Sequence, residues 1–282
     1  MARINSKRIK IGGMTQICID LKPRRCDADV FLNTKVDVTN LVDYVDKRKK
    51  DGYKTTYFHA FLLALAKTIY NRPKLNRYVK NRHMYEHTNV SISFVAKVEF
   101  DDDSEEVMLI IDVKPEDNID TISEKISKQI EKLRNKKFEK KGANGVLDIV
   151  GALPNIIRVP LVGTLKWMDE KGILPKDLQK DDLYFASAIV TDIGSLKSDS
   201  IYHNNTNFGT ASSITAIGEI RDDVKVVNGK EKIYKSCKFG INFDERIADG
   251  FYMIKAFKIL EHIIENPKLL ENRADAKVDI NK

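Results

Sequence analysis

Apolar residues recur every three or four positions in several segments of the chain, and this spacing predicts amphipathic helices. One helix is predicted to open at residues 55–56 and to end before Pro73, because proline cannot continue a helix. Another follows residues 121–124, where threonine and glutamate stand three positions apart as in a capping box. Two more are predicted over residues 39–50 and 250–266.

Other segments alternate apolar and polar residues, which predicts strands with one buried face. Residues 90–100 show the clearest alternation, and the Asn228-Gly229 pair is typical of a two-residue hairpin turn. Four further strands are predicted over residues 107–113, 184–190, 213–220 and 233–243.

Helices therefore lie between strands that mostly meet through hairpins. This order predicts an α/β fold, a two-layer sandwich in which helices cover a mixed sheet. We find no internal repeat and no linker, which favours one domain over residues 1–270. Residues 271–282 are polar, and we expect them to form a loose C-terminal tail.

Composition narrows the functional classes only a little. The net charge of +7 attracts polyanions in general, but the basic residues are spread over predicted helix ends, so we expect no nucleic-acid partner. Three cysteines without a CxxC pair favour neither a disulfide framework nor a cysteine-based metal site. We therefore expect a cytoplasmic protein that binds no metal.

One stretch stands out chemically, the charged turn of residues 244–250 between a predicted strand and a predicted helix. Functional side chains often lie on such loops, next to a rigid scaffold. A purely structural interpretation is equally open at this point. Arg246 can pair with Asp244 or Asp249 and hold the turn, while Gly250 supplies a permissive backbone.

This turn resembles the DHRxxDG signature of the acyltransferase components of 2-oxo acid dehydrogenase complexes, which share a fold with chloramphenicol acetyltransferase. Asp244, Arg246, Asp249 and Gly250 stand at matching positions. Further stretches that resemble the family in the same order are residues 36–41, 71–76, 190–194 and 265–270. The resemblance spans about residues 7–270 and implies a chloramphenicol acetyltransferase-like fold and a homotrimer with its sites between subunits.

The resemblance also implies a reaction. In the family, the signature histidine takes a proton from the thiol of coenzyme A or dihydrolipoamide, and the thiolate attacks an acyl carbonyl. In this chain Glu245 stands at the histidine position. A free carboxyl has a pKa near ~4.3 and a thiol near ~8.5, so a solvated Glu245 would be a poor base. Burial would improve it, whereas Arg246 and any nearby lysine would act in the opposite direction.

Two other residues complete the candidate site. Thr191 stands at the position of the family hydroxyl that donates a hydrogen bond to the oxyanion, although a strand threonine without a role is the plain alternative. His203, twelve residues later in a polar segment, is a candidate substitute base. His59, His83, His87 and His262 are predicted to lie at the surface.

Residues 144–173 form an apolar segment that is longer than the family needs. Pro154, Pro160 and charged residues interrupt it, so we expect no transmembrane segment. It can wall an acyl pocket, join a trimer contact or lie on a membrane surface, and Arg158, Lys166 and Trp167 suit the membrane interpretation. Packing in the core is the favoured interpretation.

Two functional hypotheses result. In the first, the protein is a coenzyme A-dependent acyltransferase that uses acyl-coenzyme A as co-substrate, with Glu245 as base, Thr191 at the oxyanion, and an Arg246–Asp249 pair that fixes the loop. We expect no lipoyl group on this chain. In the second, the protein is a catalytically degenerate trimer of the same fold that serves as a binding or scaffold protein. Neither the acyl donor nor the acceptor can be predicted from the sequence.

Overall fold

The computed structural model of the chain describes residues 5–97, 106–135, 146, 149–180 and 182–280. Its helices are α1 (Gly13–Leu21), α2 (Thr39–Lys50), α3 (Tyr57–Asn71), α4 (Ile119–Arg134), α6 (Asn155–Lys171), α7 (Lys176–Gln179) and α8 (Gly250–Glu265). Its strands are β1 (Ser6–Arg8), β2 (Asp29–Asp37), β3 (Arg77–Lys80), β4 (His83–His87), β5 (Val90–Lys97), β6 (Glu106–Val113), β7 (Ala188–Asp192), β8 (Ser213–Val227) and β9 (Lys230–Asp244).

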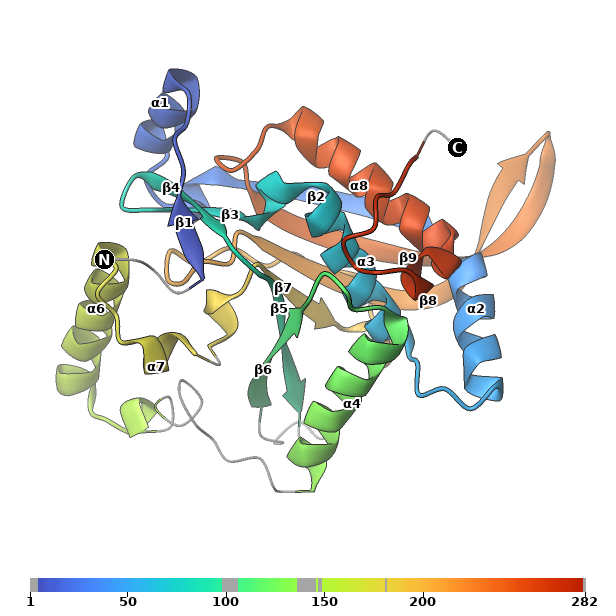
Figure 1. Ribbon diagram of the computed structural model, residues 1–282, viewed down its shortest axis with the longest axis horizontal. Helices are drawn as coiled ribbons and strands as arrows, with labels where there is room; N and C mark the ends of the chain where they lie inside the picture. The colour runs from blue at the N-terminus through green and yellow to red at the C-terminus, as the bar shows by residue number, and fades with distance from the viewer. Residues whose placement is uncertain (1–4, 98–105, 136–145, 147–148, 181, 281–282) are drawn as a thin grey trace.

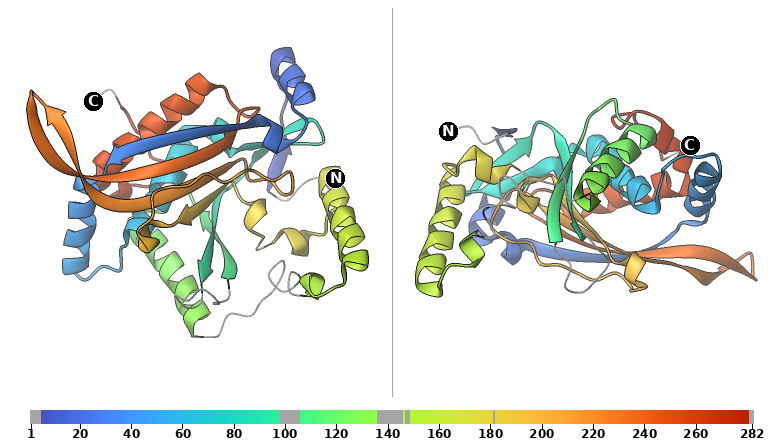
Figure 2. Two further views of the ribbon diagram at one scale, coloured as in Figure 1. Left: turned by 180° about the vertical axis from the view of Figure 1, so that it is seen from behind. Right: turned by 90° about the horizontal axis from the view of Figure 1, so that it is seen from below.

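In the described part of the chain, six strands form one sheet in the order β2-β9-β8-β7-β5-β6. β7 runs parallel to both of its neighbours and the other pairs are antiparallel, so the sheet is mixed. Helices α2, α3, α4 and α8 cover one face of it (Figures 1 and 2). β1, β4 and β3 form a small second sheet. The two-layer α/β prediction is therefore confirmed.

Local sequence signals account for most element ends. The Thr56 side chain accepts a hydrogen bond from the backbone N–H of His59 and caps α3, which ends two residues before Pro73. Asn228 and Gly229 have φ values of +51° and +74°, the left-handed conformation that joins β8 to β9 as a tight hairpin. The predicted cap of α4 lies three residues too late, because Asn118 caps that helix and Thr121 takes the third helical position.

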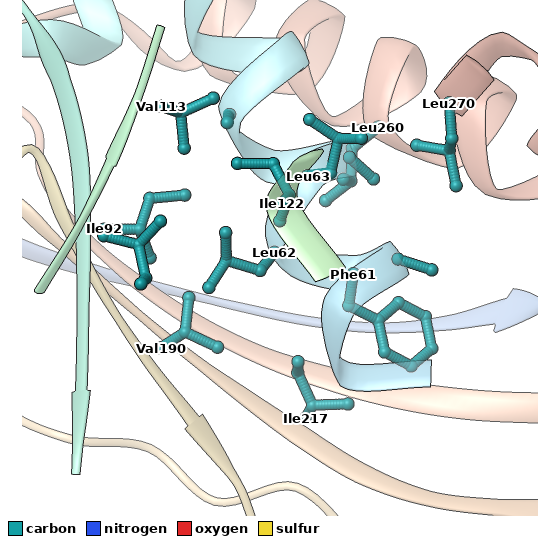
Figure 3. Packing of buried hydrophobic residues seen from close by; sticks show 14 of the residues in the cluster. Phe61, Leu62, Leu63, Ile92, Val113, Ile122, Val190, Ile217, Leu260 and Leu270 are labelled. Carbon is teal, nitrogen blue, oxygen red and sulfur yellow. The ribbon is translucent and has the colours of Figure 1, made fainter. Parts of the chain in front are cut away.

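The core lies between this helical layer and the sheet, with α3 at its centre (Figure 3). Phe61, Leu62 and Leu63 of α3 are each at most 4% exposed. They pack among apolar side chains of the sheet and of the neighbouring helices, including Ile92, Val190, Ile217, Ile122 and Leu260. The helix is buried on nearly all sides, which is more than the predicted spacing indicated, because even His59 and Lys67 are buried.

The prediction of a loose C-terminal tail is wrong for residues 271–280. Ala274 is fully buried, and its backbone N–H donates to the Asp117 carbonyl at 2.6 Å. The Lys67 ammonium donates to the Arg273 carbonyl at 2.5 Å, and Asn71 bonds the backbone of Ala276. Polar composition gave no hint of this docking, because the tail is held mainly through its own backbone groups.

The apolar segment 144–173 was expected to pack in the core, and this prediction is also wrong. Within its described part, α6 buries little more than Asp169, while Ile156 and Trp167 are 85% and 55% exposed. The helix lies at one edge of the molecule, away from the six-stranded sheet (Figures 1 and 2). No helix in the described residues is long and apolar enough to cross a bilayer.

Candidate functional site

The signature turn directly follows the buried end of β9. Asp244 is the last residue of that strand and is fully buried, whereas the Glu245 side chain is 36% exposed. The backbone N–H of Glu245 donates to the Ala28 carbonyl at 3.0 Å, which fixes the turn beside β2. The Asp249 side chain accepts a hydrogen bond from the Tyr252 N–H at 2.8 Å and caps α8.

Arg246 holds this turn from inside the protein. Its guanidinium is buried and donates to both oxygens of Asp244, at 2.8 Å and 2.6 Å. It also donates to the carbonyls of Lys22 and Pro23, at 2.9 Å and 3.1 Å. The predicted Arg246–Asp249 pair is therefore wrong. Asp244 provides a bidentate partner, and such pairs have a fixed geometry as well as a strong charge-assisted bond.

A second buried arginine, Arg25, joins the turn to the loop that precedes β8. It is 1% exposed and lies 3.8 Å from Asp244. Burial lowers the pKa of Arg25, and Asp244 opposes that effect. Arg25 donates to the carbonyls of Thr206 and Gly209, at 2.8 Å and 3.1 Å. Gly209 has a φ of +77°, and a side chain there would collide with the Tyr184 carbonyl.

Glu245 forms an ion pair with Lys22, the first residue after α1. The hydrogen bond to Glu245 raises the pKa of Lys22, so the lysine is a cation at neutral pH. Both side chains are partly exposed, at 42% for Lys22 and 36% for Glu245. Because the backbone of Lys22 is itself bonded to Arg246, the buried arginine fixes the stem of this exposed pair.

Thr191 lies far from Glu245 within one chain. It is half-buried in β7, where it pairs with Ala216, and Ala216 in turn pairs with Gly240 of β9. Glu245 follows Gly240 by five residues, about 17 Å along an extended strand at ~3.4 Å per residue. A single copy of the chain therefore does not bring the two predicted site residues together.

The histidines provide no clear substitute for the family base. His203 is exposed, and its carbonyl accepts a 2.5 Å hydrogen bond from the side chain of Asn242 in β9. His59 and His87 are buried, contrary to the prediction of surface positions. Burial lowers the pKa of each to about 4, so both are neutral near pH 7.

A buried ion pair connects α6 to the same region. Lys80 and Asp169 are 3% and 1% exposed, and their charged atoms lie 2.5 Å apart. Asp169 also accepts a hydrogen bond from the Gly209 N–H, and Lys80 donates to the Asn207 carbonyl. Burial lowers the pKa of Lys80 to about 8. The C-terminal end of α6 is therefore fixed to the loop that also binds Arg25.

Asp182 is a buried carboxyl close to this loop, and its pKa shows how burial affects stability here. It is 8% exposed, and burial raises its pKa to about 6, while its hydrogen bond from the Tyr184 N–H and the charge of Asp169 have smaller effects. The folded protein thus binds this proton more tightly than the unfolded chain, whose carboxyl has a pKa near ~3.9. The stabilising contribution of the neutral carboxyl is present below pH ~4 and is lost as the pH rises through 6.

We therefore expect Asp182→Asn to stabilise the protein at pH 7.5 by about 2–3 kcal/mol, because the amide keeps the cap without a buried charge. The advantage should disappear near pH 4, where the aspartate is neutral in the folded state. Urea unfolding of both proteins at the two pH values measures this difference. An advantage of equal size at both pH values would contradict the assignment to a buried charge.

Lys22, Arg25, Lys80 and Asp169 are the residues of this region that the sequence did not reveal. Each lies in a segment far from the turn in the sequence, and only the tertiary structure places it in this region. Two surface pockets of the described residues lie elsewhere. One is lined by residues such as Asp37 and Lys225, the other by residues such as Arg8 and His83.

Comparison with known proteins supports the resemblance seen in the sequence. The family model of the 2-oxoacid dehydrogenases acyltransferase catalytic domain matches residues 23–147 and 175–271. A comparison with curated protein sequences gives no match.

Solved structures share the fold. A probable dihydrolipoamide acetyltransferase from Listeria monocytogenes superposes with a TM-score of 0.62 at 20% identity, over 92% of this chain and 94% of that one. The dihydrolipoamide acetyltransferase of Azotobacter vinelandii gives 0.58 at 14% identity, over 93% of each chain. A chloramphenicol acetyltransferase gives 0.53 at 10% identity, over 92% of this chain and 99% of that one. The fold is therefore of the chloramphenicol acetyltransferase-like class.

Proposed function

Because this chain belongs to the family of 2-oxoacid dehydrogenase acyltransferase catalytic domains, we propose that it transfers an acyl group between a coenzyme A thioester and a thiol acceptor. The observation that carries this proposal is the intact scaffold of the signature turn. Asp244, Arg246 and Arg25 hold the turn with buried ion pairs, and the residue they present to the surface is a proton acceptor, Glu245. In this interpretation the chain keeps the Asp244 and Arg246 positions of the signature, and Glu245 replaces the histidine that takes the proton.

The Lys22–Glu245 pair can take over the role of the missing imidazole. Moving a proton from a free thiol to a free carboxyl spans ~4 pKa units, about 6 kcal/mol, against about 3 kcal/mol for imidazole. A neighbouring cation lowers the pKa of a thiol, and Lys22 is a cation next to the carboxylate. In our proposal the thiol proton moves to Glu245, the Lys22 ammonium stabilises the thiolate, and the thiolate attacks the acyl carbonyl. The tetrahedral intermediate then breaks its bond to the coenzyme A sulfur, and the leaving thiolate takes the proton back from Glu245.

We further propose that a second copy of the chain completes the site. Thr191 and Glu245 lie too far apart in one chain to act on the same substrate. A hydroxyl that donates to the oxyanion is typically worth 10²–10³ in rate, so its placement matters. One structural relative is the cubic core of a pyruvate dehydrogenase complex, with a TM-score of 0.60 at 14% identity, which is an assembly of many copies. A homotrimer with Thr191 of one subunit facing Glu245 of the next fits this arrangement.

The ion pair also favours a second candidate, a binding or scaffold protein that has lost catalysis. A carboxylate held by a lysine gains little from accepting a proton, because protonation breaks the pair. The Azotobacter vinelandii relative was studied for the role of a serine, a histidine and an asparagine in its mechanism, whereas this chain has a threonine and a glutamate at the positions proposed for the hydroxyl and the base. These two exchanges are consistent with altered or lost chemistry.

Two measurements separate these candidates. Coenzyme A or acetyl-coenzyme A at about 100 times its dissociation constant should stabilise the protein by ~2.7 kcal/mol, seen as a higher Tm.

In assays with acyl-coenzyme A and a panel of thiols, the unmodified protein should show turnover and Glu245→His should be slower, because Lys22 no longer has its anionic partner. Activity that arises only in Glu245→His would favour the scaffold candidate. No stabilisation by either ligand would contradict coenzyme A binding.

A further inference from the structure

A pocket at the start of α1, which we call the α1 pocket, is a feature that the proposed function does not use. It lies among the segment that joins β1 to α1, the first turns of α1 and the start of β4 (Figure 1). Its lining residues are Arg8, Ile9, Lys10, Ile11, Gln16, His83 and Met84. Its volume of about 560 Å³ is within the range of small-molecule sites.

The charge of the α1 pocket has one sign. Three of its lining residues are basic, namely Arg8, Lys10 and His83, and none is acidic. Neighbouring Arg82 already has an anionic partner, because Asp20 binds it at 3.0 Å. In the part of the chain that the structure describes, neither Arg8 nor Lys10 has a carboxylate partner, and both side chains are exposed. Two cations are therefore available to an anionic ligand.

The pocket also provides hydrogen-bond donors. The Arg8 guanidinium lies 3.1 Å from Nδ1 of His83. Because a guanidinium has only N–H donors, Nδ1 accepts and the ring hydrogen is on Nε2, which is left as a donor. No side chain caps α1, and open space lies beside Gly12 and Gly13 at its start. Backbone N–H groups at such a start add to the attraction for an anion.

The floor of the α1 pocket is apolar and belongs to the packing of the signature turn. Met84 is 2% exposed, and it lies with the two isoleucines of the pocket in a cluster that contains Phe243 and Ile247. Glu245 stands between these last two residues in the sequence. The pocket and the candidate base are therefore supported by the same group of apolar side chains.

Helix α1 connects the pocket to the ion pair at the turn. Gln16 lines the pocket, and Lys22, which pairs with Glu245, follows it by six residues. At ~1.5 Å per residue this separation is about 9 Å along the helix axis. A single ligand with an anionic group and a thiol can reach both places only if a long chain separates the two groups.

We propose that the α1 pocket binds the phosphate of a phosphopantetheine arm, the group that carries the thiol in coenzyme A and in acyl carrier proteins. This inference rests on the proposed function, since its ligand is the thiol carrier of that reaction. The phosphate oxygens accept hydrogen bonds from Arg8, Lys10 and Nε2 of His83, and charge-assisted bonds of this kind are the strong ones. The long, uncharged pantetheine chain then extends from the pocket toward Lys22 and Glu245.

Binding of matched ligands tests the pocket without catalysis. Isothermal titration of the full-length protein gives dissociation constants for coenzyme A, phosphopantetheine and pantetheine, which share the thiol arm and differ in their phosphates. Phosphopantetheine should bind about tenfold more tightly than pantetheine, since one hydrogen bond between charged groups contributes that much. Still tighter binding of coenzyme A would identify the free coenzyme as the source of the arm, whereas equal affinity would fit an arm on a carrier protein.

Variants of the two unpaired cations test the assignment to this pocket. Arg8→Gln and Lys10→Gln should each weaken phosphopantetheine binding about tenfold and leave pantetheine binding unchanged, because only the phosphate meets these side chains. Both residues are exposed, so the variants should fold normally, which thermal unfolding without ligand monitors. The matched control Lys230→Gln removes the same charge from an exposed residue of the β8–β9 hairpin and should bind both ligands like the unmodified protein.

Two results would overturn the proposal. The first is phosphopantetheine that binds no more tightly than pantetheine. The second is a loss of affinity in Arg8→Gln and Lys10→Gln that is no larger than in Lys230→Gln. Neither result depends on turnover, so failure of the pocket is distinct from failure of the proposed acyl transfer, which would appear as absent turnover with these affinities unchanged.

Discussion

Glu245→Gln is expected to slow acyl transfer from acyl-coenzyme A by about 10²–10⁴-fold, the usual contribution of a positioned general base. Glutamine has nearly the shape of glutamate but cannot accept the proton, and it leaves Lys22 without its anionic partner. Because the Glu245 side chain is 36% exposed, the variant should fold normally. Steady-state rates with a panel of thiol acceptors measure the effect, and thermal unfolding monitors the fold.

The control for this experiment is Glu231→Gln, which changes an exposed glutamate on β9 and should leave the rate unchanged. A Glu245→Gln protein that transfers acyl groups as fast as its parent would contradict the proposed base. Absence of turnover in the parent, together with turnover in Glu245→His, would leave the scaffold candidate as the function.

Arg246→Met is expected to destabilise the protein by about 3–5 kcal/mol. The substitution removes the bidentate partner of Asp244, which is fully buried and then keeps the backbone N–H of residue 246 at 3.1 Å and the Arg25 guanidinium at 3.8 Å. It also removes the hydrogen bonds to the carbonyls of Lys22 and Pro23, so the Lys22–Glu245 pair loses its support. Urea unfolding at neutral pH gives the change in the free energy of unfolding.

An exposed pair elsewhere in the chain serves as the matched control. Arg24 binds Asp27 at 2.7 Å, but its side chain is 67% exposed, so Arg24→Met should cost less than ~1 kcal/mol. Adding Asp244→Asn to Arg246→Met should recover part of the lost stability, because it removes the uncompensated buried charge. A cost below 1 kcal/mol for Arg246→Met would show that the turn does not depend on this pair.

Part of the order of helices and strands could be predicted, because it depends on local signals. Thr56, Pro73 and the Asn228-Gly229 pair act through their own backbone geometry, whereas α1, α6 and the strands β1 to β4 were not predicted. The signature turn was also visible in the sequence, since Asp244, Arg246 and Gly250 lie within seven consecutive positions. The sequence did not predict the correct partner of Arg246. Its guanidinium binds Asp244, whereas the Asp249 side chain caps α8.

Other features depend on contacts between distant segments. The docking of residues 271–280 rests on hydrogen bonds from Lys67 and Asn71, about 200 positions earlier in the chain, which no local pattern records. The exposure of α6 was missed for a related reason. Its apolar residues look like core residues in the sequence, and only the position of Asp169, bound to Lys80, shows which side of the helix faces the protein.

The sequence by itself determined most of the elements around the core and the two-layer fold, because these follow from neighbouring residues and their periodicity. Only the tertiary structure decided that Lys22 meets Glu245, that Thr191 lies too far away to act in the same chain, and that α6 is exposed along most of its length. These are properties of side chains brought together, or kept apart, by the packing of the whole chain.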